Sequence, residues 1–306
     1  MSTSTPPIVS VVIPTRNRPG LVVRAVNSAL AQSLAEIEVV VVVDGPDLET
    51  LAALAAIKDP RLHTAALPAS VGGAEARNIG VKNAHGKFIA LLDDDDEWYP
   101  DKLSRQYDVA TRSKLRFPVV TCRIIARRTE GDEVWPARPI RIGESMSEYL
   151  LCRDSSFRQG EGFIQTSTLF TPRDLLLWVP FQTGLPRHQD WDWMIRASAY
   201  PGVKVTWVWD TLVIYHIDPY RKSVSAGGAL APSIQWISGN KHVTPKARAY
   251  FYATQIAVRC QSIGTFFLVV RKTIGHPRAF FIAMCLALAP RSVVSMLRPR
   301  SELTHA

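Results

Sequence analysis

The first hundred residues alternate between short apolar runs and segments in which apolar residues recur at helical spacing. The apolar runs are residues 8–14, 37–43 and 88–92, and the helical pattern covers residues 21–30, 47–57 and 74–84. Residues 61–66 are expected to form a further short strand. Short runs that are apolar throughout indicate buried strands. Strands of this kind that alternate with helices predict an α/β fold in which a mostly parallel sheet is flanked by helices.

The pattern changes after Trp98. A helix is expected over residues 102–115, extended segments over 117–128 and 133–142, a short strand over 163–170, a helix after Pro186, paired strands over 203–209 and 211–216, and apolar helices from Thr244 onwards. These changes divide the chain into three parts, which are residues 1–115, 116–240 and 241–306. The last part is predicted to be a basic helical extension.

Polar side chains follow three of the predicted strands directly. They are Thr15, Asp44 and the four consecutive acids Asp93 to Asp96. Ligands of an open α/β sheet bind beyond the carboxyl ends of its strands, so we expect these groups to line one crevice. Four adjacent carboxylates repel one another, and a shared divalent cation would offset that repulsion. Hard oxygen ligands suit Mg²⁺ or Mn²⁺. A solvated acidic turn is the alternative, but the position at the end of a buried strand favours a metal.

A second acidic position lies in the stretch LPRHQDWDWMIR, residues 185–196. Asp190 is expected in the first turn of a helix, where the helix dipole stabilises a carboxylate. Acidic residues near a helix start are also common as caps. The pattern alone therefore leaves a capping role and a chemical role open.

Three segments carry a resemblance to a known family. IVSVVIPTRNRPGLVVRAVNSALAQ, VVVVVDGPD and GGAEARNIGVKNAHGKFIALLDDDDEWYPDKLSRQ resemble the nucleotide-binding half of the family 2 glycosyltransferases, which have the GT-A fold. The resemblance covers most of residues 8–107 and includes four separate motifs in the order in which the family has them. It implies an inverting transferase that uses a nucleoside-diphosphate sugar as donor.

The resemblance assigns roles to the residues after the strands. Asp93 and Asp95 correspond to the family's metal-binding DXD motif, with Asp95 preferred as the ligand and Asp94 facing the sugar nucleotide. Asp44 would bind the base. The remaining donor-binding residues that the resemblance implies are Pro14, Thr15 and Arg16 beside the base and Arg77 near the donor. An arginine on a helix surface is the alternative for Arg77.

Two further regions match the family. Asp190 corresponds to its catalytic base, although Gln189 stands where the family usually has Glu. Residues 217–225 are similar to the loop that folds over the diphosphate, in which Arg221 and Lys222 would contact phosphate and either His216 or Asp218 would complete the metal shell. A solvent-facing loop is the alternative for this region.

The resemblance implies transfer of a sugar to a hydroxyl of a glycan or lipid-linked acceptor. One alternative is a non-catalytic member that only binds sugar nucleotides or acts as a scaffold. Another is a phosphatase of the haloacid-dehalogenase type, which also has DxD after a buried strand. Those phosphatases normally carry DxD on the first strand, whereas here the first strand ends in PTRN and the acids follow much later.

The net charge of +9 is confined to the end of the chain. Residues 241–306 hold ten Lys or Arg and one acid, so this tail accounts for the whole excess. Its apolar stretches are shorter than the ~18 to 20 residues that span a bilayer. Basic, apolar helices predict attachment to an anionic membrane surface, with a helical cap on the catalytic domain as the alternative. The high aliphatic content argues against nucleic acid.

The four cysteines are far apart in the sequence and form no CxxC pair. This spacing fits a reducing compartment. The first residues lack the basic segment and cleavage site of a signal peptide. We therefore expect a cytoplasmic protein at the inner face of the plasma membrane.

Overall fold

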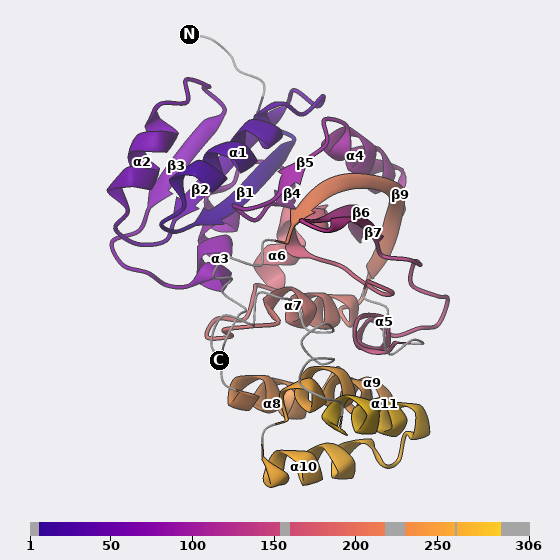
Figure 1. The fold of residues 1–306 in the computed structure, drawn as a ribbon. Helices are drawn as coiled ribbons and strands as arrows, with labels where there is room; N and C mark the ends of the chain where they lie inside the picture. The colour runs from indigo at the N-terminus through magenta and orange to yellow at the C-terminus, as the bar shows by residue number, and fades with distance from the viewer. Residues whose placement is uncertain (1–5, 154–159, 218–229, 261, 289–306) are drawn as a thin grey trace. The chain divides into compact units, whose positions relative to one another are not determined.

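The computed structural model describes residues 6–153, 160–217, 230–260 and 262–288. The chain forms two compact units. Unit 1 comprises residues 1–134, 164–184 and 192–216, and unit 2 comprises residues 135–163, 185–191 and 217–306. The positions of the two units relative to one another are not determined (Figure 1). Their boundaries differ from those of the three predicted parts, whose division into a donor half, an acceptor half and a tail stays a prediction.

Unit 1 is built on a single sheet, in which the described residues form nine strands. The strands are β1 (Val9–Thr15), β2 (Ile37–Val43), β3 (Leu62–Ala66), β4 (Phe88–Leu91), β5 (Glu97–Trp98), β6 (Phe117–Arg128), β7 (Gly131–Trp135), β8 (Phe170–Pro172) and β9 (Val203–His216). Their order across the sheet is β3-β2-β1-β4-β8-β6-β9-β5, and β7 pairs with β6.

The first four strands of this order are parallel. All residues of β1, β2 and β4 are buried, as expected for strands covered on both faces. In the register of this half, Thr15 lies opposite Val43, and Val12 lies opposite Leu91. The chain that follows β4 therefore passes beside the end of β1. The predicted fold class is confirmed here.

The other half of the sheet is mixed, and it corrects three predictions. Residues 203–216 form one strand, β9, which runs parallel to β6, rather than two strands paired with each other. A bulge explains the error, because the register passes from Cys122 opposite Val208 to Arg123 opposite Thr211. A second shift follows, because Ile124 lies opposite Val213, so three residues of β9 are extra and interrupt the pattern of the sequence.

The strands predicted at 163–170 and 133–142 are also mostly absent. Residues Thr166–Thr168 form a 3-10 turn, and β8 begins only at Phe170. The side chain of Gln165 accepts a hydrogen bond from the Ser167 amide, which favours the turn over a strand. The strand β7 ends at Trp135 because Pro136 has no N–H to donate.

Helices flank the sheet of unit 1. They are α1 (Pro19–Leu30), α2 (Leu48–Ala55), α3 (Gly73–Asn83), α4 (Lys102–Arg112) and α6 (Arg173–Trp178), together with most of α7 (Gln189–Ser198), which begins in unit 2. Helix α3 packs on β1 and β2, and α4 packs on β6 and β9. The end of α7 is held in unit 1 by Trp193, which stacks on Phe181 and donates its indole N–H to the Val179 carbonyl at 2.7 Å.

Unit 2 is helical in its described residues. Its helices are α5 (Met146–Leu151), α8 (Leu230–Gly239), α9 (Pro245–Phe251), α10 (Ile263–Thr273) and α11 (Pro277–Leu288), with a π-helical turn at Tyr252–Ile256 and a 3-10 turn at Ala257–Arg259 between α9 and α10. Helix α9 packs on α5, and α10 packs on α11. The predicted helical C-terminal extension is confirmed.

One lysine is buried in the core of unit 1. Lys102, the first residue of α4, has no exposed surface. Its ammonium lies 3.8 Å from the centre of the Trp98 ring and donates a 2.7 Å hydrogen bond to Gln106 Oε1. Burial lowers the pKa of Lys102 to about 7. Above about pH 7, Lys102 of the folded protein therefore loses a proton. In the unfolded chain the same lysine keeps that proton up to its ordinary pKa of about 10.4.

This difference predicts a pH dependence of stability. Between pH 7 and pH 9 the unfolded state binds more protons at Lys102, so the free energy of unfolding should rise with pH by about 2 kcal/mol from this residue alone. The Lys102→Met variant should lack that rise in the free energy of unfolding, which urea denaturation at the two pH values measures. Substitution of the exposed Lys114 by Met is the control and should leave the rise unchanged. Equal pH slopes for wild type and Lys102→Met would contradict the prediction.

Candidate active site

The acids Asp93 to Asp96, which we call the aspartate cluster, begin two residues after the end of β4 at Leu91. The backbone turns back on itself here, because the Asp96 amide donates to the Asp93 carbonyl at 3.2 Å. The Asp93 amide donates to Ser167 Oγ at 3.0 Å. The turn therefore gathers four carboxylates at the carboxyl end of a central strand.

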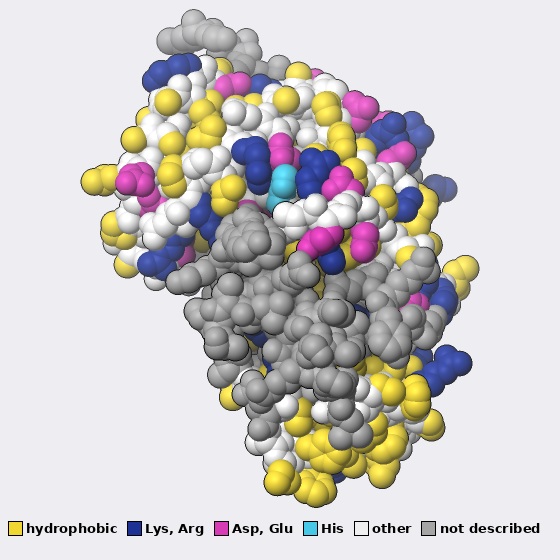
Figure 2. All heavy atoms as spheres, viewed as in Figure 1, with side chains coloured by type: hydrophobic (Ala, Val, Ile, Leu, Met, Phe, Trp, Pro, Cys, Tyr) yellow, Lys and Arg dark blue, Asp and Glu magenta, His cyan; other side chains and the backbone are white. Residues whose placement is uncertain are grey.

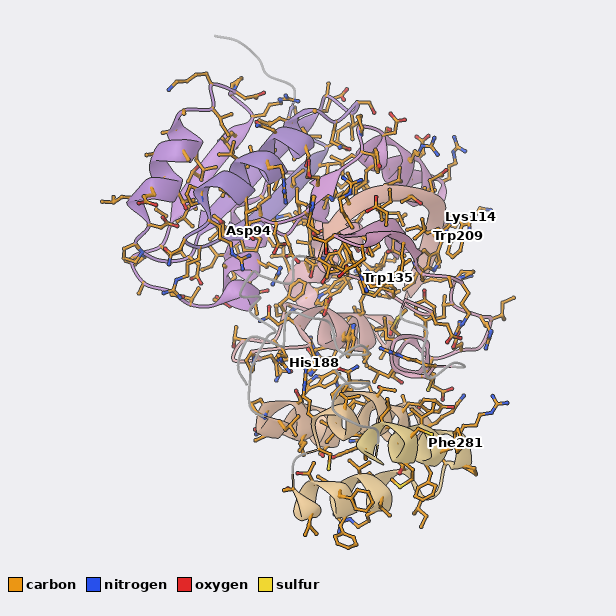
Figure 3. All side chains as sticks on the ribbon, in the orientation of Figure 1. Asp94, Lys114, Trp135, His188, Trp209 and Phe281 are labelled. Atoms are coloured by element: carbon orange, nitrogen blue, oxygen red, sulfur yellow. The ribbon has the colours of Figure 1, made fainter. Side chains whose placement is uncertain are left out.

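Asp94 connects the cluster to the end of β1. Its carboxylate accepts hydrogen bonds of 2.8 Å from the Thr15 hydroxyl and from the Arg18 guanidinium. Figure 3 labels Asp94 in unit 1. Burial, with the neighbouring charge of Asp95, raises the pKa of Asp94 to about 6, although Arg18 and Thr15 act in the opposite direction. The predicted convergence of the ends of β1 and β4 is therefore observed.

Asp95 contacts two arginines that follow β1, namely Arg18 in the turn before α1 and Arg24 in α1. Arg18 Nη1 lies 3.2 Å from Asp95 Oδ2, and Arg24 donates to the Asp95 carbonyl at 2.6 Å. The side chain of Asp95 is 18% exposed, whereas that of Asp94 is 8% exposed. Arg18 thus places one positive charge between two carboxylates, of which Asp95 is the more open to solvent.

Asp93 and Asp96 share one amide group. Gln165 Nε2 donates to Asp93 Oδ2 at 2.9 Å and to Asp96 Oδ2 at 2.8 Å. Asp96 also accepts from the Ser167 hydroxyl at 2.6 Å, and Arg77 lies 2.5 Å from Asp93 Oδ1. Burial and the charges of Asp95 and Asp93 raise the pKa of Asp96 well above its usual range. Asp96 is therefore an internal support, while Asp93 is oriented from both sides.

Asp44 organises the segment before α3. Its carboxylate accepts hydrogen bonds from the Ser70 hydroxyl at 2.8 Å and from the amides of Val71 and Gly72 at 2.6 and 3.0 Å. Arg16 donates to the same Ser70 hydroxyl at 2.8 Å. The Asp44 side chain is nearly fully buried and joins the ends of β1 and β2 to the start of α3.

The backbone of Asp44 also contacts the end of β1. Its amide donates to the Thr15 carbonyl at 2.8 Å. Pro14 precedes Thr15 in β1 and is buried, whereas Arg16 is exposed just beyond the strand. The structure therefore brings Pro14, Thr15, Arg16 and Asp44 to one edge of the sheet, together with the aspartate cluster.

His216 lies beside the cluster and contacts both Glu97 and Asp96. Its Nε2 is 2.7 Å from Glu97 Oε1, and its backbone amide donates to Asp96 Oδ1 at 3.4 Å. Burial lowers the pKa of His216, while the hydrogen bond to Glu97 raises it. Asp218, Arg221 and Lys222 lie outside the described residues, so their predicted roles stay predictions.

The chemistry of the cluster fits a divalent cation. The Arg18 guanidinium contacts carboxylate oxygens of both Asp94 and Asp95, so these oxygens face a position where a positive charge is favourable. Within the described ranges, no three metal-binding side chains converge on a point. Mg²⁺ commonly takes only one or two carboxylates from the protein and its other oxygens from substrate phosphates and water. The cluster meets that requirement without a complete protein cage.

Asp190 lies in unit 2, in the first turn of α7. It is half-buried, and its Oδ1 accepts a 2.8 Å hydrogen bond from the Trp191 amide. This contact satisfies one amide of the helix start, as the capping alternative requires. Gln189, which replaces the family's Glu, donates to the Leu185 carbonyl at 2.7 Å.

An aromatic cluster holds the turn that precedes Asp190. The His188 ring stacks on Trp191 and Trp236, with ring centroids 5.2 and 4.9 Å apart, and meets the edge of Phe251. Its Nε2 is 2.9 Å from the Ser233 hydroxyl, and burial lowers the pKa of His188 to about 3. Figure 3 labels His188 in unit 2. A neutral imidazole therefore anchors this turn.

The His188 backbone has φ of 62°, which a residue other than glycine seldom adopts. Strained residues of this kind persist where their surroundings fix them, often at functional sites. The stacked rings supply that fixation here. The approach of the chain to Asp190 is therefore set by packing in unit 2.

Sequence reasoning missed four residues that shape the site, namely Arg18, Arg24, Gln165 and Ser167. Arg18 lies between the strand predicted at residues 8–14 and the helix predicted at residues 21–30, but the pattern does not indicate its partner. Gln165 and Ser167 come from a weakly patterned region in which the sequence gives no signal for a contact with acids some 70 residues earlier.

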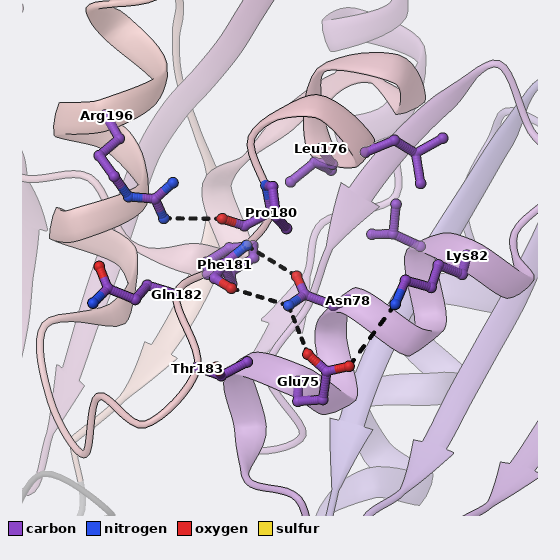
Figure 4. A pocket seen from close by; sticks show the side chains of 11 residues that line it. Glu75, Asn78, Lys82, Leu176, Pro180, Phe181, Gln182, Thr183 and Arg196 are labelled. Carbon is purple, nitrogen blue, oxygen red and sulfur yellow. Dashed lines mark hydrogen bonds and ion pairs between the residues drawn. The ribbon is translucent and has the colours of Figure 1, made fainter.

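A pocket of about 460 Å³ lies elsewhere in unit 1, between α3, α6 and the segment before α7 (Figure 4). Asn78 crosses it and exchanges hydrogen bonds of 2.9 and 3.0 Å with the Phe181 backbone. Its other lining includes Glu75, Lys82 and Arg196. None of its lining residues is a predicted site residue, and its acidic group is already paired with Asn78. The aspartate cluster is therefore the better candidate for chemistry.

Comparison with protein families gives a match over more than half of the chain. Residues 10–174 match the model described as "Glycosyl transferase family 2". The amylovoran biosynthesis glycosyltransferase AmsB of Erwinia amylovora is 28% identical over 283 residues, which are 89% of this chain and 90% of that protein. The succinoglycan biosynthesis protein ExoO of Rhizobium meliloti is 39% identical over 120 residues, which are 39% of this chain and 34% of that protein.

Two solved structures have a similar fold. TarS 1–349 of S. aureus, in complex with UDP-GlcNAc, superposes with a TM-score of 0.61 at 16% identity and covers 96% of this chain and 88% of that chain. The mannosyltransferase PcManGT of Pyrobaculum calidifontis, in complex with GDP-Man and Mn²⁺, superposes with a TM-score of 0.54 at 18% identity and covers 97% and 83%. These likenesses support the GT-A-like fold.

The shared amide of Gln165 generates a prediction about the integrity of the cluster. Gln165→Glu keeps the shape but puts a fifth carboxylate against Asp93 and Asp96. Loss of the two hydrogen bonds and the added repulsion should lower the free energy of unfolding by at least ~2 kcal/mol at neutral pH. The loss should shrink at low pH, where the new group is protonated. Urea denaturation measures both effects.

The exposed Gln182 provides the matched control. Gln182→Glu should change stability by less than ~0.5 kcal/mol, the usual range for surface substitutions. The account of the cluster fails if Gln165→Glu is as stable as Gln182→Glu.

Proposed function

The chain belongs to glycosyltransferase family 2, and we propose that it transfers a sugar from a nucleoside-diphosphate donor to an acceptor hydroxyl with inversion at the anomeric carbon. The observation that carries this proposal is the network at the carboxyl edge of the sheet. Thr15, Asp44 and the aspartate cluster, which come from three strand ends, are joined there by hydrogen bonds. Ligands of open α/β sheets bind at this edge.

The donor is proposed to bind along the ends of β1 and β2. Asp44 would bind the base, with Pro14, Thr15 and Arg16 beside it. The contacts of Asp44 with the amides of Val71 and Gly72 support a fixed position for this carboxylate. Arg77 is proposed to act near the donor by orienting Asp93, with which it is paired, rather than as a helix-surface residue.

A divalent cation, Mg²⁺ or Mn²⁺, is proposed to bind at Asp95 and Asp93. When bound, it would neutralise the charge that develops on the departing nucleoside diphosphate. Arg18 and Arg77 offset part of the negative charge of the cluster, which leaves charge for a cation to balance. His216 and Asp218 are further candidates for this shell, and Arg221 and Lys222 for contact with the diphosphate.

Asp190 is proposed to be the general base. The acceptor hydroxyl must lose a proton as its oxygen attacks the anomeric carbon, and a carboxylate within hydrogen-bonding reach takes that proton. Attack from the side opposite the leaving group inverts the anomeric centre. The aromatic cluster around His188 supports this role, because it fixes the turn that carries Asp190.

The acceptor is proposed to be a glycan or a lipid-linked glycan of a polysaccharide pathway. The named relatives are proteins of amylovoran and succinoglycan biosynthesis. AmsB supports this proposal most, since its similarity extends over nearly the full length of both chains. A non-catalytic, sugar-nucleotide-binding member is the competing proposal, and donor turnover distinguishes the two.

Replacement of Asp190 tests the proposed base. Asp190→Asn should still bind nucleoside diphosphate but should turn over donor at least ~10²-fold more slowly, the usual scale for a lost general base. Release of nucleoside diphosphate measures the rate. Asp174 provides a matched control, because it is an exposed acid in the first turn of α6. Equal rates for Asp190→Asn and Asp174→Asn would reject the assignment and favour a capping role.

Replacement of Asp95 tests the metal site. Asp95→Asn should lower turnover by ~10²-fold or more, since a metal supplies several kcal/mol of charge stabilisation. It should also weaken the dependence of turnover on Mn²⁺. Asp101→Asn, at an exposed position near the cluster, should behave as wild type. Wild-type Mn²⁺ dependence in Asp95→Asn would show that the cation binds elsewhere.

A further inference from the structure

The last two described helices, α10 and α11, expose large apolar side chains although each also has a buried face. In α10, Val269 and Thr273 are buried, while Ile263 is 76% and Phe267 is 64% exposed. Ile274, which caps the same helix, is 66% exposed. Ile263, Phe267 and Ile274 are separated by four and seven residues, a spacing that places them on one stripe of the helix.

In helix α11 the exposed face carries one large apolar side chain. Ala279, Ala283 and Leu286 are buried, whereas Phe281 is 66% exposed. Figure 2 shows hydrophobic side chains gathered on the part of unit 2 where Figure 1 shows α10 and α11. Figure 3 labels Phe281 in this part. Four of the large apolar residues that the described chain exposes thus lie within residues 263–281.

Positive charge accompanies the apolar side chains. Residues 230–288, which include α8 to α11, contain seven Lys or Arg and no Asp or Glu. Arg271 in the last turn of α10 and Arg278 in the first turn of α11 are both exposed. Exposed Phe and Ile side chains flanked by arginine, with no acid nearby in the sequence, are typical of helices that lie in a membrane interface.

We propose that α10 and α11 form a membrane-binding face that docks on an anionic lipid surface. Anionic headgroups attract the basic side chains, and the exposed Ile and Phe side chains enter the boundary between headgroups and acyl chains. A second copy of the chain fits this face less well, because two such surfaces would bring like charges together.

The lengths of the helices fit a surface position. Helices α10 and α11 have 11 and 12 residues, against about 20 residues for a helix that crosses the hydrocarbon core. No helix in the described part of the chain has the length and hydropathy to span a membrane. The face is therefore proposed to lie on one leaflet, and it does not depend on the proposed transfer reaction.

Flotation of the full-length protein with lipid vesicles tests this proposal. Vesicles with phosphatidylglycerol should bind the protein, and vesicles of phosphatidylcholine alone should bind it at least ~10-fold more weakly. High salt should release only part of the protein, because it screens the charge attraction but leaves the apolar contacts in place. Absence of binding to phosphatidylglycerol vesicles would overturn the proposal, as would equal binding to both lipids.

Two pairs of variants locate the face. Phe267→Ser with Phe281→Ser should weaken binding at least ~10-fold, whereas Leu48→Ser, at a residue 82% exposed on α2, should not. Arg271→Gln with Arg278→Gln should weaken binding roughly tenfold, whereas Lys58→Gln with Lys114→Gln, at exposed positions of unit 1, should change it less.

The oligomeric state in solution decides between lipid and a second copy. Light scattering after size exclusion should give the same mass for wild type and the Phe267→Ser with Phe281→Ser variant. A dimer that this double variant dissociates would overturn the proposal and assign the face to self-association. Circular dichroism of each variant should match that of the wild type, which shows that lost binding does not come from lost helical structure.

Discussion

Repulsion among four consecutive carboxylates is the constraint around which unit 1 is arranged. The end of β4 delivers Asp93 to Asp96 to one point, where their charges would oppose folding if nothing balanced them. One amide, that of Gln165, donates to two of these carboxylates. One guanidinium, that of Arg18, lies between two of them. Each carboxylate thereby has a defined partner.

The sheet provides the positions that this balance needs. Parallel register places the ends of β1, β2 and β4 at one edge, so that Thr15 meets Asp94 and the Asp44 amide meets the Thr15 carbonyl. Because β1 and β2 are buried along their whole length, these ends cannot shift without exposing core side chains. Core packing thus fixes the positions of the strand ends, and the polar partners balance the charges that these ends bring together.

The strand and helix pattern of the first hundred residues was readable from the sequence because uniformly apolar runs mark buried parallel strands. The convergence of Thr15, Asp44 and the aspartate cluster followed from that pattern and the geometry of parallel sheets. The support from Gln165 could not be predicted, since an amide in an unpatterned segment finds its partners only through tertiary structure. The strand β9 was read as two strands because its bulge interrupts the pattern.

Unit 2 shows the same limit. Asp190 was identified from a motif, and its place at the start of α7 agrees with the expected helix. The stacking of His188 between Trp191 and Trp236 was not visible, because those side chains are brought together by α7 and α8. The proposed base therefore depends on an aromatic core that the sequence does not mark.

The central claim is that the aspartate cluster and the ends of β1 and β2 bind a nucleoside diphosphate together with a divalent cation. Isothermal titration of the wild-type protein with uridine and guanosine diphosphates, each with Mn²⁺ and with a chelator, tests this most directly. The account predicts that at least one nucleotide binds with Mn²⁺ and that the chelator weakens this binding at least ~10-fold. Binding of neither nucleotide, or binding of equal strength with the chelator, would contradict it.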